Sequence, residues 1–139
     1  MSFKASIEVD GKTWRVISCQ YTFRQPINLE TGLPIAHVQG GTIDLEIEST
    51  GDLTFIAWML DPKHIKNGTI TYFQRDGEQK LKDIKFKNGF VVSYKENFNN
   101  HGEDPMTESI TISSEEFIIT SSIRGGGEVN HKNYWASKM

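Results

Sequence analysis

Strict alternation of apolar and polar residues opens the chain and predicts a β-strand. From Phe3 to Asp10, apolar residues occupy every second position, with charged or hydroxyl residues between them. Successive side chains of a strand point to opposite faces, so one face of this segment meets a core and the other meets water. The dipeptide Asp10-Gly11 then favours a tight hairpin. A return strand starts at Trp14, and its apolar phase slips by one position just after Val16, which indicates a β-bulge.

The same period of two recurs along most of the chain. Asn88-Gly89 separates two of these segments and is a second strong hairpin signal. The alternating segments after the first hairpin are residues 40–50, 81–87, 90–95 and 106–113, and a last strand is expected around Phe117 to Ile119. Many short strands separated by turn residues predict a mainly β fold, either a barrel or a sandwich.

One segment departs from this pattern and predicts a single short helix. From Leu53 to Leu60, apolar residues have helical spacing on one face and additional apolar residues on a second face. Ser49 with Asp52 resembles a weak capping box, and Pro62 ends the helix. A helix that is apolar nearly all round is expected to be largely buried, either by its own chain or by a neighbour.

The segment from Arg24 to Ala36 is a long connection with an unusual content of apolar residues. Ordinary connections have about 4–6 residues, and longer ones often have a function. Two interpretations stay open: the segment folds back over one end of the β structure, or it reaches a partner. The apolar residues that would make such a partner contact are Ile27, Leu29, Leu33 and Ile35.

The end of the chain is expected to form a separate segment. We expect a β domain over residues 1–124 and a flexible, Gly-rich tail over residues 125–139. Tyr134 and Trp135 in this tail are further candidate residues for contact with a partner.

Composition and charge narrow the function classes. The chain has 139 residues, enough for one domain with one core, and a formal net charge of −3. This charge gives no electrostatic reason to expect a nucleic-acid partner. One cysteine, no signal-peptide pattern and no long apolar run predict a protein made in a reducing cytoplasm, without membrane insertion.

The sequence contains no recognisable catalytic or cofactor-binding motif, so we expect no enzyme, no cofactor and no metal. The four histidines lack the close spacing of a zinc pair, and Cys19 is in phase with buried strand residues. A weak calcium-loop pattern runs from Asn97 to Glu108, but it begins with Asn and its flanks are strand-like.

Charged residues form two one-sided rows on expected strands. Alternation on an antiparallel sheet produces such rows without any chemistry, so they are expected to face solvent, to line water inside a pore, or to pair between copies. The acidic row is Asp44, Glu46 and Glu48, and the basic row begins with Lys80 and Lys82.

Four segments together resemble the Hcp family, also called TssD. They are Ser2–Lys12, Gly40–Thr50 with the Trp58-Met59 helix that follows, Val92–Phe98 and Asp104–Ser113. Hcp proteins form the inner tube of the bacterial type VI secretion system. The resemblance covers residues 2 to about 119. It rests on the length of chain that matches and on the order of the matching segments, and not on a catalytic signature.

The resemblance implies an antiparallel β-barrel with one short α-helix, related to phage tail-tube proteins. It implies hexameric rings that stack into a hollow tube, which is expelled to deliver effectors and also carries effectors in its lumen. The implied partners are other copies of the chain and the sheath, spike and effector proteins. It further implies export from the cytoplasm by the type VI system without a cleaved signal peptide. The alternative is a monomeric β-barrel that binds a small ligand or a carbohydrate, since barrels often do so.

Overall fold

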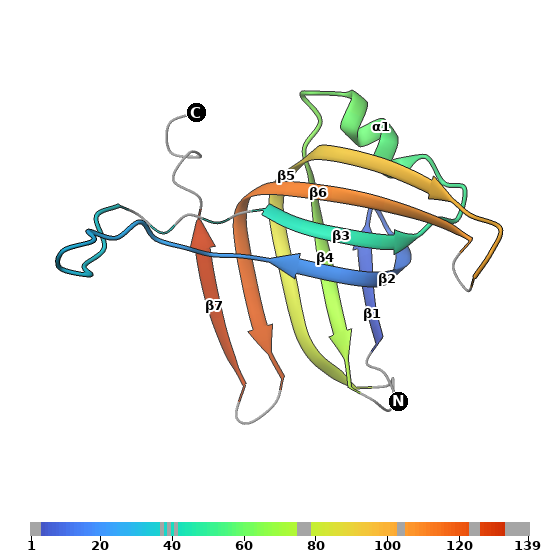
Figure 1. Ribbon diagram of the computed structural model, residues 1–139. Helices are drawn as coiled ribbons and strands as arrows, with labels where there is room; N and C mark the ends of the chain where they lie inside the picture. Colours follow the sequence, from blue (N-terminus) through green and yellow to red (C-terminus); the bar gives the residue numbers. More distant parts are fainter. Residues whose placement is uncertain are drawn as a thin grey trace.

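The computed structural model describes residues 4–36, 38, 40, 42–74, 79–102, 105–122 and 126–132. Phe3, Tyr134 and Trp135 lie outside the described residues. Within the described part, the elements in chain order are β1 (Lys4–Val9), β2 (Lys12–Tyr21), β3 (Thr42–Glu48), α1 (Thr54–Leu60), β4 (Lys66–Phe73), β5 (Lys80–Phe98), β6 (Met106–Ser121) and β7 (Gly127–Lys132) (Figure 1).

Six of the strands close into an antiparallel barrel. The strand order is β3-β2-β1-β4-β5-β6-β7, and β3 also pairs with β6. This closing pair runs from Thr42 opposite Ser113 to Glu48 opposite Thr107. Closure removes the exposed strand edges that aggregate most readily. The expected mainly β barrel with one short helix is therefore confirmed.

Strands β5 and β6 are much longer than the others and belong to both halves of the barrel. They pair with each other from Lys82 opposite Ser121 to Phe98 opposite Met106. The first part of β6 lies between β5 and β3, and its last part lies between β5 and β7. The edge of β6 thus changes partner part of the way along the strand.

The ribbon of β5 and β6 bends where the sequence predicted a hairpin. Asn88 has a positive φ of 54°, but β5 continues through it, so the prediction of a hairpin at Asn88-Gly89 is wrong. The backbone groups at the bend find other partners: Trp58 Nε1 donates to the Gly89 carbonyl at 3.1 Å, and Asn67 Oδ1 accepts from the Asn88 amide at 2.8 Å. On β6, the Ser114 hydroxyl is fully buried and contacts the carbonyl of residue 87 at 2.7 Å. These bonds stabilise a bend in a continuous strand.

The first hairpin and the bulge agree with the sequence. Asp10 and Gly11 have φ values of 55° and 76°, as a two-residue turn between strands of this twist requires. The register of β2 against β3 shifts between Val16 and Ser18, at the position where the apolar phase slips. Both predictions are therefore confirmed.

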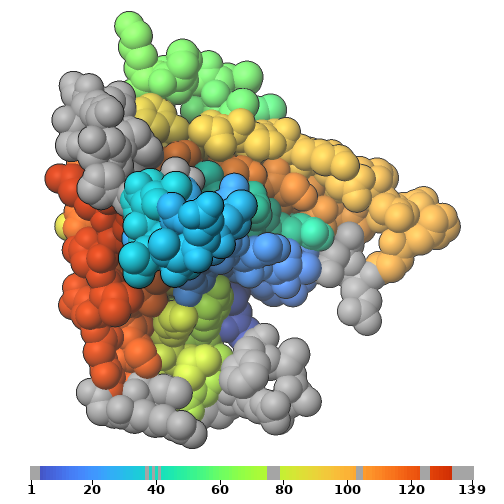
Figure 2. Space-filling model, turned by 60° about the vertical axis from the view of Figure 1, so that its left-hand side comes forward, coloured from blue at the N-terminus to red at the C-terminus, as the bar shows by residue number. Residues whose placement is uncertain are grey.

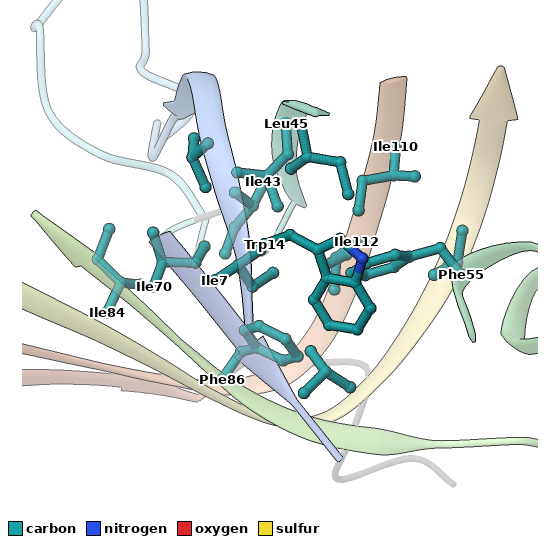
Figure 3. Packing of buried hydrophobic residues seen from close by; sticks show 14 of the residues in the cluster. Ile7, Trp14, Ile43, Leu45, Phe55, Ile70, Ile84, Phe86, Ile110 and Ile112 are labelled. Atoms are coloured by element: carbon teal, nitrogen blue, oxygen red, sulfur yellow. The ribbon is translucent and has the colours of Figure 1, made fainter. Parts of the chain in front are cut away.

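The barrel interior is filled with side chains from every strand of the closed ring. Figure 3 shows large apolar residues from different strands pointing toward one another around Trp14. The inward row of each strand alternates with polar residues on the outer face, as the period of two predicts. The labelled members of this core are Ile7, Trp14, Ile43, Leu45, Phe55, Ile70, Ile84, Phe86, Ile110 and Ile112.

Helix α1 packs one face on this core and leaves the other face in solvent. Phe55 and Trp58 are buried, and the Phe55 ring meets Trp14 edge-on with centroids 4.7 Å apart. Leu53 and Leu60 are 70% and 74% exposed. The helix spans Thr54–Leu60, one residue shorter than expected, and the apolar residues at its two ends are not covered by its own chain.

Gly68 allows β4 to pass close to its neighbours. A Cβ at this position would lie 2.9 Å from the Glu8 carbonyl oxygen and 2.4 Å from Cζ of Phe86. We predict that Gly68→Ala lowers the free energy of unfolding by about 1–3 kcal/mol, the usual effect of overpacking. Urea unfolding measures this change. Thr69→Ala, on the outer face of the same strand, is the control, and equal stability of the two variants would contradict the prediction.

Candidate functional site

The segment Arg24–Ala36 forms a narrow arm and does not cover the barrel. In Figure 1 it continues from β2 and projects past β7. Its two limbs are joined by an isolated bridge between Ile27 and Pro34 and by a hydrogen bond from the Ile35 amide to the Pro26 carbonyl at 3.0 Å. The first of the two interpretations, a loop folded over the β structure, is therefore wrong.

The turn of the arm is organised by local hydrogen bonds. Asn28 Oδ1 accepts from the amides of Glu30 and Thr31, at 2.8 and 3.2 Å. The Gly32 amide donates to the Asn28 carbonyl at 2.8 Å, and Gly32 has a φ of 73°, which favours glycine. An Asx turn of this kind fixes a tight reversal without a hydrophobic core.

The arm exposes most of its apolar side chains. Leu29 is 93% exposed, Leu33 and Ile35 are both 64% exposed, and Ile27 is 49% exposed. Figure 2 shows the arm in blue and cyan, in front of the strands of the barrel. A single exposed leucine needs no explanation, but four such residues on one projecting segment are typical of an interaction surface.

Strand β7 forms an additional edge beside the arm. It pairs only with the last part of β6 among the described strands, from Glu116 opposite Lys132 to Ser121 opposite Gly127. Part of the expected flexible tail is therefore an ordered strand, while the division at residue 124 stays a prediction. This strand could not be predicted from the apolar pattern because Val129 is its single large apolar residue, and that residue is 64% exposed.

The acidic row lies on the outer face of β3, where the alternation placed it. Thr111 Oγ1 donates to Asp44 Oδ1 at 2.7 Å, and Arg15 Nε donates to Glu48 Oε2 at 2.7 Å. Asp44 and Glu46 border a shallow hollow of about 300 Å³, with Lys95 from β5 on its other side. This surface is hydrophilic, and whether it faces a lumen stays a prediction.

The two lysines at the start of β5 do not form one row. Lys80 is exposed, with its Nζ 4.0 Å from Asp83 Oδ2. Lys82 turns the other way: its Nζ donates to the Tyr21 hydroxyl at 2.9 Å and lies 5.6 Å from the centre of that ring. The β4–β5 register shifts near Phe73 opposite Lys80, which accounts for the difference.

The segment before α1 is tied to the first hairpin by an ion pair. Lys12 Nζ lies 2.8 Å from Asp52 Oδ2, and Asp52 Oδ1 accepts from the Thr54 amide at 2.7 Å. The hydrogen bond from the Lys12 amine is the main cause, and the bonds from Thr54 come next, of a pKa of Asp52 that is lowered from its ordinary value of 3.8 to about 2. Asp52, and not Ser49, thus holds the start of the helix.

A buried acid lies in the barrel near the start of β6. Glu108 is 1% exposed, and its Oε1 accepts from the Tyr94 hydroxyl at 2.6 Å, whereas its Oε2 has no hydrogen-bond partner among the residues that the structure describes. Burial, and then the bond to Glu108, raises the pKa of Tyr94. Glu108, the last position of the weak calcium pattern, therefore points into the core.

Cys19 packs against the core as a small side chain. Burial raises the pKa of its thiol, so the thiol stays protonated at neutral pH. Among the described residues, no group of three or more His, Cys, Asp or Glu side chains is arranged to hold a metal ion. In the same part of the chain, no helix is long and apolar enough to cross a membrane.

A closed antiparallel barrel with one short helix and a projecting arm defines a mainly β barrel protein, and comparisons with known proteins identify its family. The profile of the family described as "TssD: Hemolysin coregulated protein Hcp (TssD)" matches residues 1–136. Hcp1 from Flavobacterium johnsoniae is 34% identical in sequence, with a TM-score of 0.80 over 92% of this chain and 99% of that chain. The chain belongs to the Hcp (TssD) family, and it is therefore a type VI secretion protein.

More distant structures share the fold. Hcp1 from Salmonella typhimurium has a TM-score of 0.78 at 14% identity, over 95% of each chain. A type VI secretion system effector from Yersinia pestis has a TM-score of 0.71 at 15% identity, over 93% of this chain and 99% of that chain. A search of curated proteins returned no match.

The Asp52 ion pair predicts an acid-sensitive contribution to stability. Because the folded-state pKa of Asp52 is depressed, its contribution is present above pH 3.8 and is lost as the pH falls to about 2. We expect Asp52→Asn to lose stability at neutral pH and to show a smaller further loss in acid than the unmodified protein. Thermal unfolding at several pH values tests this, with Asp61→Asn at the other end of α1 as the control. A parallel pH dependence of Asp52→Asn and the unmodified protein would contradict the assignment.

The Tyr94–Glu108 pair makes a second prediction about stability. Tyr94→Phe removes the one partner of a buried carboxyl group and should cost about 1–3 kcal/mol. In a Glu108→Met background the carboxyl group is absent, so the same substitution should cost much less. Denaturant unfolding of the four proteins gives both values. Equal costs in the two backgrounds would show that the hydrogen bond contributes nothing.

Proposed function

We propose that this chain is a structural subunit of the type VI secretion tube. Hexameric rings of the chain stack into a hollow tube, which is expelled to deliver effectors. The role is structural and not catalytic. Membership of the Hcp family supports this proposal, and the observation that carries it is the arm, whose apolar residues project into solvent.

Burial of the arm by a neighbouring subunit explains its composition. Leu29 and Leu33 gain almost nothing from the fold of their own chain, since both are mostly exposed. Complete burial of one such side chain contributes on the order of 2 kcal/mol, so four of them supply a substantial part of a subunit contact. The hydrogen bonds inside the arm reduce the entropy that docking would otherwise cost.

Ring formation also needs two different surfaces on each subunit. A head-to-tail contact joins one patch to a different patch of the next copy, and only such a contact closes a ring larger than a dimer. The arm and the free edge of β7 lie on one side of the barrel in Figure 1, and the turn after β5, with Phe98 69% exposed, lies on the other. This separation is compatible with head-to-tail assembly.

The same proposal assigns roles to the acidic row and to the tail residues, and it names the further partners and the route of export. The acidic row of β3 lines the lumen or pairs between copies, and effectors are carried within the lumen. Tyr134 and Trp135 contact an adjacent ring. The further partners are the sheath, spike and effector proteins, and the tube is exported from the cytoplasm without a cleaved signal peptide.

The alternative of a monomeric ligand-binding barrel has less support. Barrels that hold a small ligand keep an open interior. Here the interior of the described part is filled by buried apolar side chains, and the hollow beside Asp44 and Glu46 lies on the outer face. A ligand would have to bind on the outside of the wall.

We predict that serine substitutions in the arm weaken ring formation without weakening the fold. The variant combines Ile27→Ser, Leu29→Ser, Leu33→Ser and Ile35→Ser. Each lost side chain removes more than about 1.4 kcal/mol of burial, or about tenfold in affinity, so rings should disappear at concentrations where the unmodified protein forms them. Analytical ultracentrifugation and negative-stain images measure this, and thermal unfolding checks the fold.

The matched control changes exposed apolar residues elsewhere. Leu53→Ser and Leu60→Ser alter the outer face of α1, far from the arm in sequence, and should leave ring formation close to normal. If the arm variant assembles as well as the unmodified protein, the arm is not a subunit contact.

A further inference from the structure

Phe23 lies at the root of the arm and continues the inward face of β2. It follows Tyr21 by two residues, so the period of two carries its ring to the same side as Tyr21. The ring meets three others edge-on: Tyr21 with centroids 6.0 Å apart, Phe117 of β6 at 6.2 Å and His131 of β7 at 5.1 Å. The first residues after β2 are thereby attached to both β6 and β7.

Gly40 holds the same ring from the other end of the arm. A Cβ at position 40 would lie 2.2 Å from Cδ1 and 3.1 Å from Cγ of Phe23. The ring also packs against Phe117 and His131, which limits how far it can turn aside. The backbone of Gly40 is outside the positive-φ region, so an alanine would meet no backbone strain there. Contact with Phe23 is thus the reason that this position needs glycine.

The two contacts together close the base of the arm. Residue 23 precedes it and residue 40 follows it, and Gln25 Nε2 adds a bond to the Ala36 carbonyl at 3.3 Å. The Gln25 bond and the other bonds of the arm join the arm to itself. The direction of the arm relative to the barrel therefore depends on where its base is held. Few other contacts are available to the arm, because its apolar residues point into solvent.

We propose that Phe23 is the positioning residue of the arm. Its ring, seated on Gly40 and against Phe117 and His131, sets the angle at which the arm leaves the barrel. It thereby presents the apolar residues of the arm in one direction to a neighbouring subunit. This inference rests on the proposed function for its consequence in assembly, but the positioning itself is a property of the single subunit.

The consequence for assembly follows from conformational entropy. A rigid arm loses little freedom when it docks, whereas an arm that swings about its base must be ordered at that moment. Ordering even one backbone residue costs enough free energy to weaken association about tenfold. Loss of the Phe23 ring should therefore weaken ring formation although none of the docking residues has changed.

Two substitutions remove the contact from opposite sides. Phe23→Ala deletes the ring, and Gly40→Ala displaces it. Pulsed electron paramagnetic resonance measures the distance between spin labels on Glu30→Cys in the turn of the arm and Thr13→Cys on β2, in a Cys19→Ala background. We expect a narrow distance distribution in the parent and a broader one in both variants. Adding Gly40→Ala to Phe23→Ala should have no further effect, because the ring that it displaces is already absent.

Assembly is measured on the same proteins without labels. We expect Phe23→Ala and Gly40→Ala to weaken ring formation about tenfold, and Phe23→Tyr, which keeps the ring, to assemble normally. Leu60→Ala, at an exposed leucine on the outer face of α1, is the control, and thermal unfolding confirms that each variant folds. Unchanged distance distributions in both variants would overturn the proposal, as would broadening without any loss of assembly. If the parent forms no rings while the distributions still broaden, the tube function fails and the positioning of the arm stands.

Discussion

Pairing between β5 and β6 along nearly their whole lengths is the interaction on which the rest of the structure depends. Both strands are far too long to stay in one flat sheet, so the ribbon bends at Asn88 and Ser114 and contributes to both halves of the barrel. The bend lets the first part of β6 accept β3 and close the barrel, while the last part remains available to β7. Trp58 of the helix bonds to the backbone at this bend, which ties α1 to the same feature.

The result is a molecule with a closed core and some apolar residues that remain exposed. Nearly all large apolar residues of the six barrel strands are inside. Most of the exposed ones lie on the arm, on the outer face of α1, at the end of β5 and on β7, and the others are Val38, Ile65 and Val92. A closed barrel has little need of the exposed residues on the arm for its own stability, so these residues are best explained by contact with another subunit. A head-to-tail ring requires separated surfaces of this kind.

The sequence predicted the elements better than their connections. Alternation located the strands, the phase slip after Val16 located the bulge, and helical spacing placed α1 to within one residue. Asn88-Gly89 was misassigned because a residue with positive φ serves a bend in a continuous strand as well as a hairpin turn, and only the tertiary bonds of Trp58 and Asn67 decide between them. Strand β7 could not be predicted because its pairing depends on the edge that β6 leaves free, and its own sequence barely alternates.

The candidate surfaces were predicted in part. The apolar content of the arm was visible in the sequence, but its projection away from the barrel was not. Alternation placed the acidic row correctly, whereas Lys82 left its expected row because a register shift turned it toward Tyr21. The contact of Phe23 with Gly40 joins residues at the two ends of the arm, and the local pattern of apolar and polar residues does not predict such a contact.

The central claim is that this chain assembles into rings, and its mass in solution tests that claim most directly. Mass photometry or sedimentation of the unmodified protein, followed by negative-stain images, should show a species near six times the chain mass of 15.8 kDa, with ring-shaped particles and short stacks. A protein that stays at the mass of one chain over the whole accessible concentration range would contradict the account.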